Sequence, residues 1–292
     1  MYELLRNRKL LFSCLFILNL TSCGSVEPEL PSKPLPTIPA PTPDKDLPTR
    51  PKPEPTPEPK IESCVNGQTY GVENKQYPGR GLHMVARCDG YKPLVVGNNG
   101  TGAPAMYYRA TAQHLASKGF RVIWPENPQT GNGKTCIAAL EYGFKQPDTY
   151  PGMYAVTGHS QGGSATLACG GLAERKWPDY RAAFLPNEPA CGMSAGNIRT
   201  LAGAIDQKVL FFAGDRDTVV RESWVKQCYN YVKADKALVI GRGATHFNTQ
   251  SYIPELALGF FKGALLDQIE GWEILDQLDP RKYNWKENFE EI

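Results

Sequence analysis

The chain has 292 residues, and its 32 Lys and Arg against 30 Asp and Glu give a net charge of only +2. Because nucleic-acid-binding domains carry a marked basic excess, this balance gives no reason to expect a nucleic-acid partner. Residues 61–292 are numerous enough for one domain with a sizeable buried core.

The first 24 residues carry the pattern of an export signal. Three basic residues precede an apolar run, Leu10 to Leu20, that is too short to span a bilayer. The following Leu20-Thr21-Ser22-Cys23-Gly24 resembles the lipobox of a bacterial lipoprotein signal. The resemblance implies that residues 1–22 are removed and that palmitate or similar chains on Cys23 anchor the protein to a membrane of the cell envelope. An ordinary secretory signal peptide, with release of the protein, is the alternative.

Gly24, with no aspartate after the cysteine, is similar to the outer-membrane sorting pattern, which leaves a periplasmic or a surface-exposed location open. Residues 24–60 then carry thirteen of the 25 prolines of the chain and almost no large apolar side chains. No core can form from that composition, so residues 23–60 are predicted to be a lipidated cysteine and a disordered linker. In polyproline II conformation the linker would reach up to roughly 110 Å.

Six cysteines remain after Cys14 is removed with the signal and Cys23 takes the lipid. Disulfide bonds agree with an exported protein, but the sequence cannot choose among the many possible pairings. Proximity in sequence favours Cys64–Cys88, Cys136–Cys169 and Cys191–Cys228. A zinc site is the competing interpretation, which no paired C-x-x-C or H-x-x-H spacing supports.

Pro93 to Val96 is predicted to be a buried strand, and it runs into the glycine-rich loop Gly97-Asn98-Asn99-Gly100-Thr101-Gly102. Glycines let a backbone approach a ligand closely. Backbone N–H groups of this loop are therefore candidates to bind a negatively charged oxygen, Gly100 first and Thr101 next.

Gly158-His159-Ser160-Gln161-Gly162 is the most informative stretch of the chain. It lies between a predicted strand, Met153 to Thr157, and a predicted helix, Ser164 to Glu174. A serine between two glycines at this spacing is typical of a nucleophile elbow, with the N–H of Gln161 as an oxyanion donor. The alternative is a tight turn with an exposed serine.

A nucleophilic serine needs a base, and the chain has only four histidines. His246 follows the predicted strand Ala237 to Ile240 and precedes the helical segment Ser251 to Leu266, which is a usual place for the base. His83 falls in a predicted N-terminal strand region, and His114 lies in the predicted helix Tyr107 to Lys118. His159 is expected to support the elbow and not to face the serine.

The base needs a carboxylate partner from another strand end. The strand Lys208 to Ala213 runs into Gly214-Asp215-Arg216-Asp217, and Asp217 is preferred because it is better placed to turn back toward the histidine. Asp215 is expected to cap the turn or to pair with Arg216. Glu188, which follows the predicted strand Arg181 to Leu185, is the less favoured candidate for this carboxylate.

These segments together, from about Pro93 to Leu266, resemble the α/β-hydrolase superfamily and, within it, the cutinase-like polyester hydrolases and their dienelactone-hydrolase and chlorophyllase-like neighbours. The resemblance implies a mostly parallel central sheet flanked by helices. Polyester-cleaving members usually carry an aromatic residue in the oxyanion loop and Met after the serine, where this chain has Gly100 and Gln161. These two differences argue against cleavage of aromatic polyesters, whereas hydrolysis of other esters is still expected.

The sequence therefore predicts a serine carboxylic-ester hydrolase with Ser160, Asp217 and His246, working through an acyl-enzyme, without metal or cofactor, as a monomer. There is room for only one short helix between Pro186 and Lys208, where a lid would lie, so exposed or polymeric esters are favoured. A carbohydrate esterase for acetyl or feruloyl groups and an acyltransferase remain open with the same residues. A surface lipoprotein that binds a ligand on an inactive hydrolase scaffold is the non-enzyme alternative. The segment Glu270 to Ile292 is predicted to be an accessory helix and tail.

Overall fold

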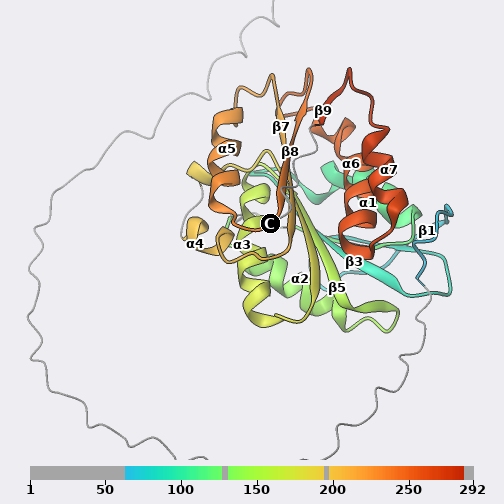
Figure 1. The fold of residues 1–292 in the computed structure, drawn as a ribbon. Helices are drawn as coiled ribbons and strands as arrows, with labels where there is room; N and C mark the ends of the chain where they lie inside the picture. The colour runs from blue at the N-terminus through green and yellow to red at the C-terminus, as the bar shows by residue number, and fades with distance from the viewer. Residues whose placement is uncertain (1–62, 127–130, 194–196, 286–292) are drawn as a thin grey trace, which may run out of the picture. The chain divides into compact units, whose positions relative to one another are not determined.

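A computed structural model describes residues 63–126, 131–193 and 197–285 of the chain (Figure 1). The chain divides into two units, 1–56 and 57–292, and every described residue belongs to the second. The predicted signal peptide, the lipidation site Cys23 and the whole proline-rich linker lie outside the described residues.

One nine-stranded sheet forms the centre of the domain, in the order β1-β2-β4-β3-β5-β6-β7-β8-β9. The six strands from β4 to β8 in this order run parallel, whereas β1, β2 and β9 are antiparallel to their neighbours at the two edges. The strands are β1 (Val72–Asn74), β2 (Gly81–Ala86), β3 (Lys92–Asn98), β4 (Arg121–Pro125), β5 (Thr149–His159), β6 (Arg181–Asn187), β7 (Lys208–Gly214), β8 (Lys236–Gly241) and β9 (Tyr283–Trp285). The prediction of a mostly parallel sheet in an α/β fold is confirmed.

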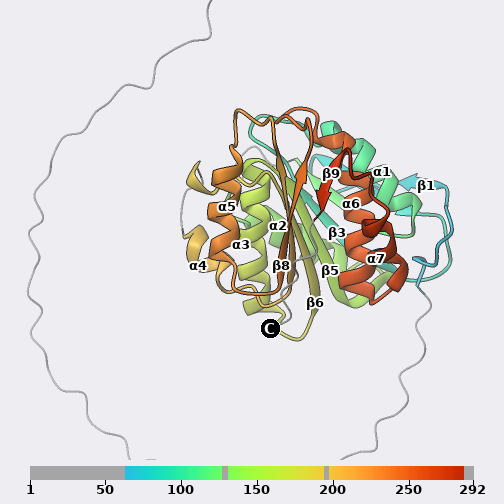
Figure 2. The same ribbon diagram turned by 45° about the horizontal axis from the view of Figure 1, so that its top comes forward.

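Helices cover both faces of the sheet, with α2, α3, α4 and α5 on one side and α1, α6 and α7 on the other (Figures 1 and 2). The first group is α2 (Lys134–Phe144), α3 (Gln161–Lys176), α4 (Ile198–Ala202) and α5 (Glu222–Tyr231). The second is α1 (Arg109–Ser117), α6 (Ile253–Phe260) and α7 (Ile269–Asp276). Short helical turns are η1 (Ala105–Tyr108), η2 (Cys191–Met193), η3 (Thr249–Ser251) and the π-helical η4 (Phe261–Leu265).

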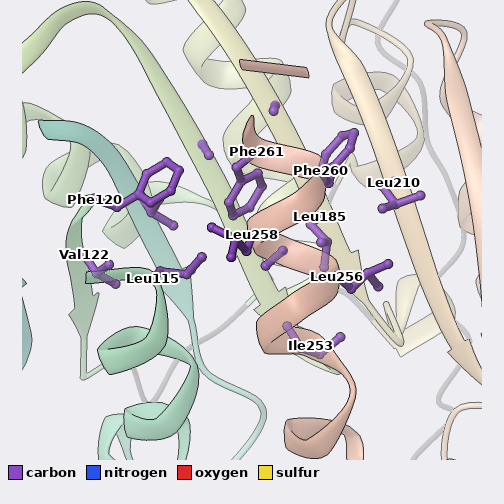
Figure 3. Packing of buried hydrophobic residues seen from close by; sticks show 14 of the residues in the cluster. Leu115, Phe120, Val122, Leu185, Leu210, Ile253, Leu256, Leu258, Phe260 and Phe261 are labelled. Carbon is purple, nitrogen blue, oxygen red and sulfur yellow. The ribbon is translucent and has the colours of Figure 1, made fainter. Parts of the chain in front are cut away.

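Each face of the sheet has its own apolar core, because central strands such as β3 are buried on both sides and present apolar residues in both directions. Figure 3 shows the core beneath α6, where Leu256 and Phe260 lie with Leu185 of β6 and Leu210 of β7. The predicted helix 251–266 is divided into η3, α6 and η4. Pro254 in the first turn of α6 fits this division, since proline is favoured where a helix begins.

Three disulfide bonds join the predicted pairs, Cys64–Cys88, Cys136–Cys169 and Cys191–Cys228. Cys136–Cys169 ties α2 to α3, and Cys191–Cys228 ties the segment after β6 to α5. Their sulfurs are bonded to each other and so are not available as zinc ligands. A disulfide of this kind contributes about 2–4 kcal/mol, and its presence is compatible with an oxidising compartment.

Between β6 and β7 the described residues form only η2 and the five-residue α4, as expected from the short spacing. The C-terminal segment packs as α7 against α6 and then adds β9 to the sheet beside β8. This edge strand was not predicted. Within the described ranges, no helix has the length and apolar character needed to cross a bilayer.

Candidate active site

Ser160 occupies a strained turn between β5 and α3. Its φ of 59° and ψ of −121° are unusual for a residue other than glycine. A Cβ at Gly158 would lie 2.7 Å from the carbonyl carbon of Gly162, and a Cβ at Gly162 would lie 2.5 Å from the carbonyl oxygen of Asn99. Both positions therefore require glycine, since a side chain at either one would clash with the backbone of the turn or of the glycine-rich loop.

Three side chains from separate strand ends meet at this turn. His246 Nε2 lies 3.0 Å from Ser160 Oγ, and His246 Nδ1 lies 2.7 Å from Asp217 Oδ2. Ser160 follows β5, Asp217 follows β7 and His246 follows β8, so the parallel order of the strands brings their carboxyl ends to one edge. All three residues are buried, with 7–8% of their surface exposed.

Asp217 is fixed by its own loop, because its Oδ1 accepts hydrogen bonds from the N–H groups of Val219 and Val220. Asp215 has a different role, since its Oδ1 accepts from the N–H of Gly243 and so holds together the loops after β7 and β8. The structure thus brings Asp217, and not Asp215, to the histidine.

The charges of Asp217 and Glu188 affect the pKa of His246, and His246 in turn affects the pKa of Asp217. Burial alone would lower the pKa of His246, but the hydrogen bonds and charges of Asp217 and Glu188 outweigh it and raise this pKa to about 9. Burial would raise the pKa of Asp217, and hydrogen bonds from His246 and from the backbone lower it below its usual value. The arrangement therefore favours the ion pair of an imidazolium with a carboxylate.

A second acid and a second histidine adjoin the first pair. Glu188 Oε2 lies 3.2 Å from His159 Nε2 and 3.5 Å from His246 Nδ1, and the two imidazole rings are 4.5 Å apart between centroids. His159 Nδ1 is 3.2 Å from the hydroxyl of Tyr108. Sequence reasoning placed His159 correctly away from the serine but did not predict these contacts, for which the sequence contains no motif.

The other two histidines lie elsewhere. His83, on β2, lies 2.7 Å from the guanidinium of Arg121, and burial followed by the charge of Arg121 lowers its pKa to about 4. His114, on α1, faces Glu255.

The glycine-rich loop lies beside the elbow but differs in detail from the prediction. The N–H of Gly100 donates to the hydroxyl of Tyr108 at 2.8 Å, so this donor is already engaged. The hydroxyl of Thr101 donates to Gln161 Oε1 at 2.6 Å, which links the loop to the residue after the serine. Thr101, the second choice from the sequence, is therefore the better candidate for a donor to a bound oxygen.

Exposed apolar side chains gather on the loops of this edge. Phe247, next to His246, is 74% exposed, and Met106 is 54% exposed. The hydroxyl of Tyr107, which is itself partly exposed, donates to the carbonyl of Phe247. Val219, two residues after Asp217, is also exposed. We call these four residues the apolar rim.

His159, Glu188 and His246 also place one ligand atom each within 4.8 Å of one another, a spacing that would suit a metal ion. However, the same atoms are engaged in the hydrogen bonds described above. A metal bound through His246 would have to compete with Asp217 for Nδ1.

Comparison with protein-family models gave no match, and comparison with curated proteins gave none either.

Proposed function

We propose that the protein is a serine carboxylic-ester hydrolase with the α/β-hydrolase fold. The observation that carries the proposal is the continuous set of contacts Ser160–His246–Asp217, built on a glycine-flanked serine at positive φ. The chain order serine, aspartate, histidine along a parallel sheet also supports this fold.

The mechanism follows from the contacts. Ser160 Oγ attacks the ester carbonyl while its proton passes to His246 Nε2, and Asp217 stabilises the resulting imidazolium through Nδ1–H. The tetrahedral intermediate collapses, the imidazolium gives its proton to the departing alkoxide, and an acyl-Ser160 ester remains. Water, deprotonated by His246, then attacks this ester, and the imidazolium returns the proton to Ser160 Oγ as the carboxylic acid is released.

The negative oxygen of the intermediate needs two donors, each worth about 3 kcal/mol of barrier. We assign them to the backbone N–H groups of Gln161, which opens α3, and of Thr101. The hydrogen bond between the side chains of Thr101 and Gln161 holds these two positions together.

The substrate class is inferred from the surroundings of the serine. The apolar rim offers contact area to an acyl or polymer chain, and the described residues between β6 and β7 form only η2 and α4, which are too short to make a lid domain. Extended, hydrophobic esters of lipids or polymers fit such a site better than small polar ones. Acylation at Cys23 would anchor the protein to a membrane of the cell envelope, and the proline-rich linker would allow the domain a reach of up to roughly 110 Å from that anchor.

The first experiment is hydrolysis of p-nitrophenyl esters, from acetate to long acyl chains, by the protein and by its Ser160→Ala variant. We expect serine-dependent turnover that increases with chain length and is unaffected by EDTA. A preference for acetate would favour the carbohydrate esterase, and transfer to an added alcohol in preference to water would favour an acyltransferase. No turnover by the folded protein would favour a binding lipoprotein, and loss with EDTA would indicate a metal at the histidine–glutamate cluster.

A further inference from the structure

Glu188 is an acid that the proposed mechanism does not use, and it lies in an unusual position. It follows β6 directly, has a φ of 47° and is completely buried. Its N–H donates to the carbonyl of Phe212, and a Cβ on Gly214 would lie 2.7 Å from its Oε1, so glycine at 214 leaves room for the carboxylate. Because positive φ costs about 1 kcal/mol or more in such a residue, the surroundings must hold it there.

A chain of polar contacts ends on Glu188. Its Oε2 lies 3.2 Å from His159 Nε2, and Nδ1 of the same ring lies 3.2 Å from the hydroxyl of Tyr108. That hydroxyl accepts the N–H of Gly100. Burial raises the pKa of Tyr108, which keeps this hydroxyl protonated. The glycine-rich loop is thereby connected to the acid.

In the part of the chain that the structure describes, the basic side chains that contact Glu188 are two histidines, His159 and His246. In the described ranges, no lysine or arginine forms an ion pair with Glu188 or Asp217. Glu188 Oε1 has no hydrogen-bond partner among the described residues, although it is buried. A buried carboxylate without a lysine or arginine is costly unless it interacts with a positive charge that forms beside it.

We propose that Glu188 is a second carboxylate for His246, a positioning residue that shares the Nδ1 side of the imidazole with Asp217 and is itself oriented by His159. This inference rests on the proposed function for its effect on catalysis, but the charge coupling exists independently of any reaction. Two carboxylates favour the imidazolium that forms when Ser160 loses its proton, and they make the base stronger.

The same coupling shifts the activity toward alkaline pH. The groups that face His246 are Asp217, Glu188, His159 and Ser160. Burial lowers the pKa of His246, but the hydrogen bonds and charges of Asp217 and Glu188 outweigh burial and raise this pKa to about 9. The base works only when neutral, so turnover rises with pH up to this pKa. Removing the charge of Glu188 lowers the pKa and moves the rise toward neutral pH.

The test is a titration of the imidazole ring of His246 by NMR in the full chain and in Glu188→Gln, which keeps the shape of the side chain. With four histidines in the sequence, each signal is assigned by one His→Gln variant. We expect the pKa of His246 to fall by at least about 1 in Glu188→Gln, since one of two adjacent charges is lost. An unchanged pKa would overturn the proposal. The matched control is Glu174→Gln, which removes a buried acid on α3 at about 20 Å from Ser160 along the helix. This variant should leave the pKa of His246 unchanged.

Kinetics provide the second readout. The acid limb of the kcat/KM profile should move with the NMR pKa in Glu188→Gln. Asp217→Asn should retain more activity than the double variant with Glu188→Gln, because Glu188 still faces Nδ1. Equal losses in the single and double variants would contradict a shared role. If no variant and no wild-type protein hydrolyses esters, the proposed function fails, while the NMR result still decides the coupling.

Discussion

Gly162→Ala tests the steric basis of the elbow. Ordinary contacts of a Cβ begin at 3.4 Å, whereas a Cβ here would lie 2.5 Å from the carbonyl oxygen of Asn99, which is 0.9 Å too close. The obstructing atoms belong to the backbone of the glycine-rich loop, so relief requires this loop to move. We expect a loss of about 3 kcal/mol of unfolding free energy, at the upper end of overpacking effects.

For a domain of this size the loss corresponds to a fall in Tm of about 6–12 °C by calorimetry. Turnover should fall further than stability predicts, because the loop that moves carries Thr101. The control is Gly71→Ala, whose Cβ would meet nothing closer than 3.5 Å and should change stability by no more than about 0.5 kcal/mol. If Gly162→Ala had the same Tm as Gly71→Ala and kept full activity, the steric argument for the elbow would be wrong.

Two further predictions concern stability. Burial, with a contribution from Asp206, raises the pKa of Glu174 to about 8, so the folded state retains a proton that the unfolded chain loses near pH 4.5. The contribution of Glu174 to the free energy of unfolding should therefore decrease between pH 4.5 and 8, by up to about 5 kcal/mol. Urea denaturation at each pH measures this contribution as the difference between the wild-type protein and Glu174→Gln. Tyr108→Phe leaves the N–H of Gly100 and the ring of His159 without the shared hydroxyl. It should cost about 1–3 kcal/mol in the same assay, and an unchanged midpoint would refute the hydrogen-bonded chain.

The sequence allowed the elbow and its partners to be predicted because the constraints are local. Gly158 and Gly162 are required by the turn itself, and the alternation of strands and helices places Asp217 and His246 after successive strands. Elimination among four histidines was sufficient to choose His246.

The contacts of His159, Glu188 and Tyr108 could not be predicted in the same way. They join the ends of β5 and β6 to η1, and they depend on side-chain directions that no periodicity encodes. The same holds for the engagement of the Gly100 N–H by Tyr108. The antiparallel edge strands β1 and β9, with three residues each, are too short to give an alternating pattern.

The central claim is that Ser160 is a nucleophile activated by His246. The most direct measurement is treatment of the folded protein with a fluorophosphonate, followed by mass spectrometry of its peptides. We predict a single adduct, on Ser160, whose formation is slowed strongly in His246→Gln but not in His114→Gln. An unlabelled Ser160, or labelling at a rate independent of His246, would contradict the proposal.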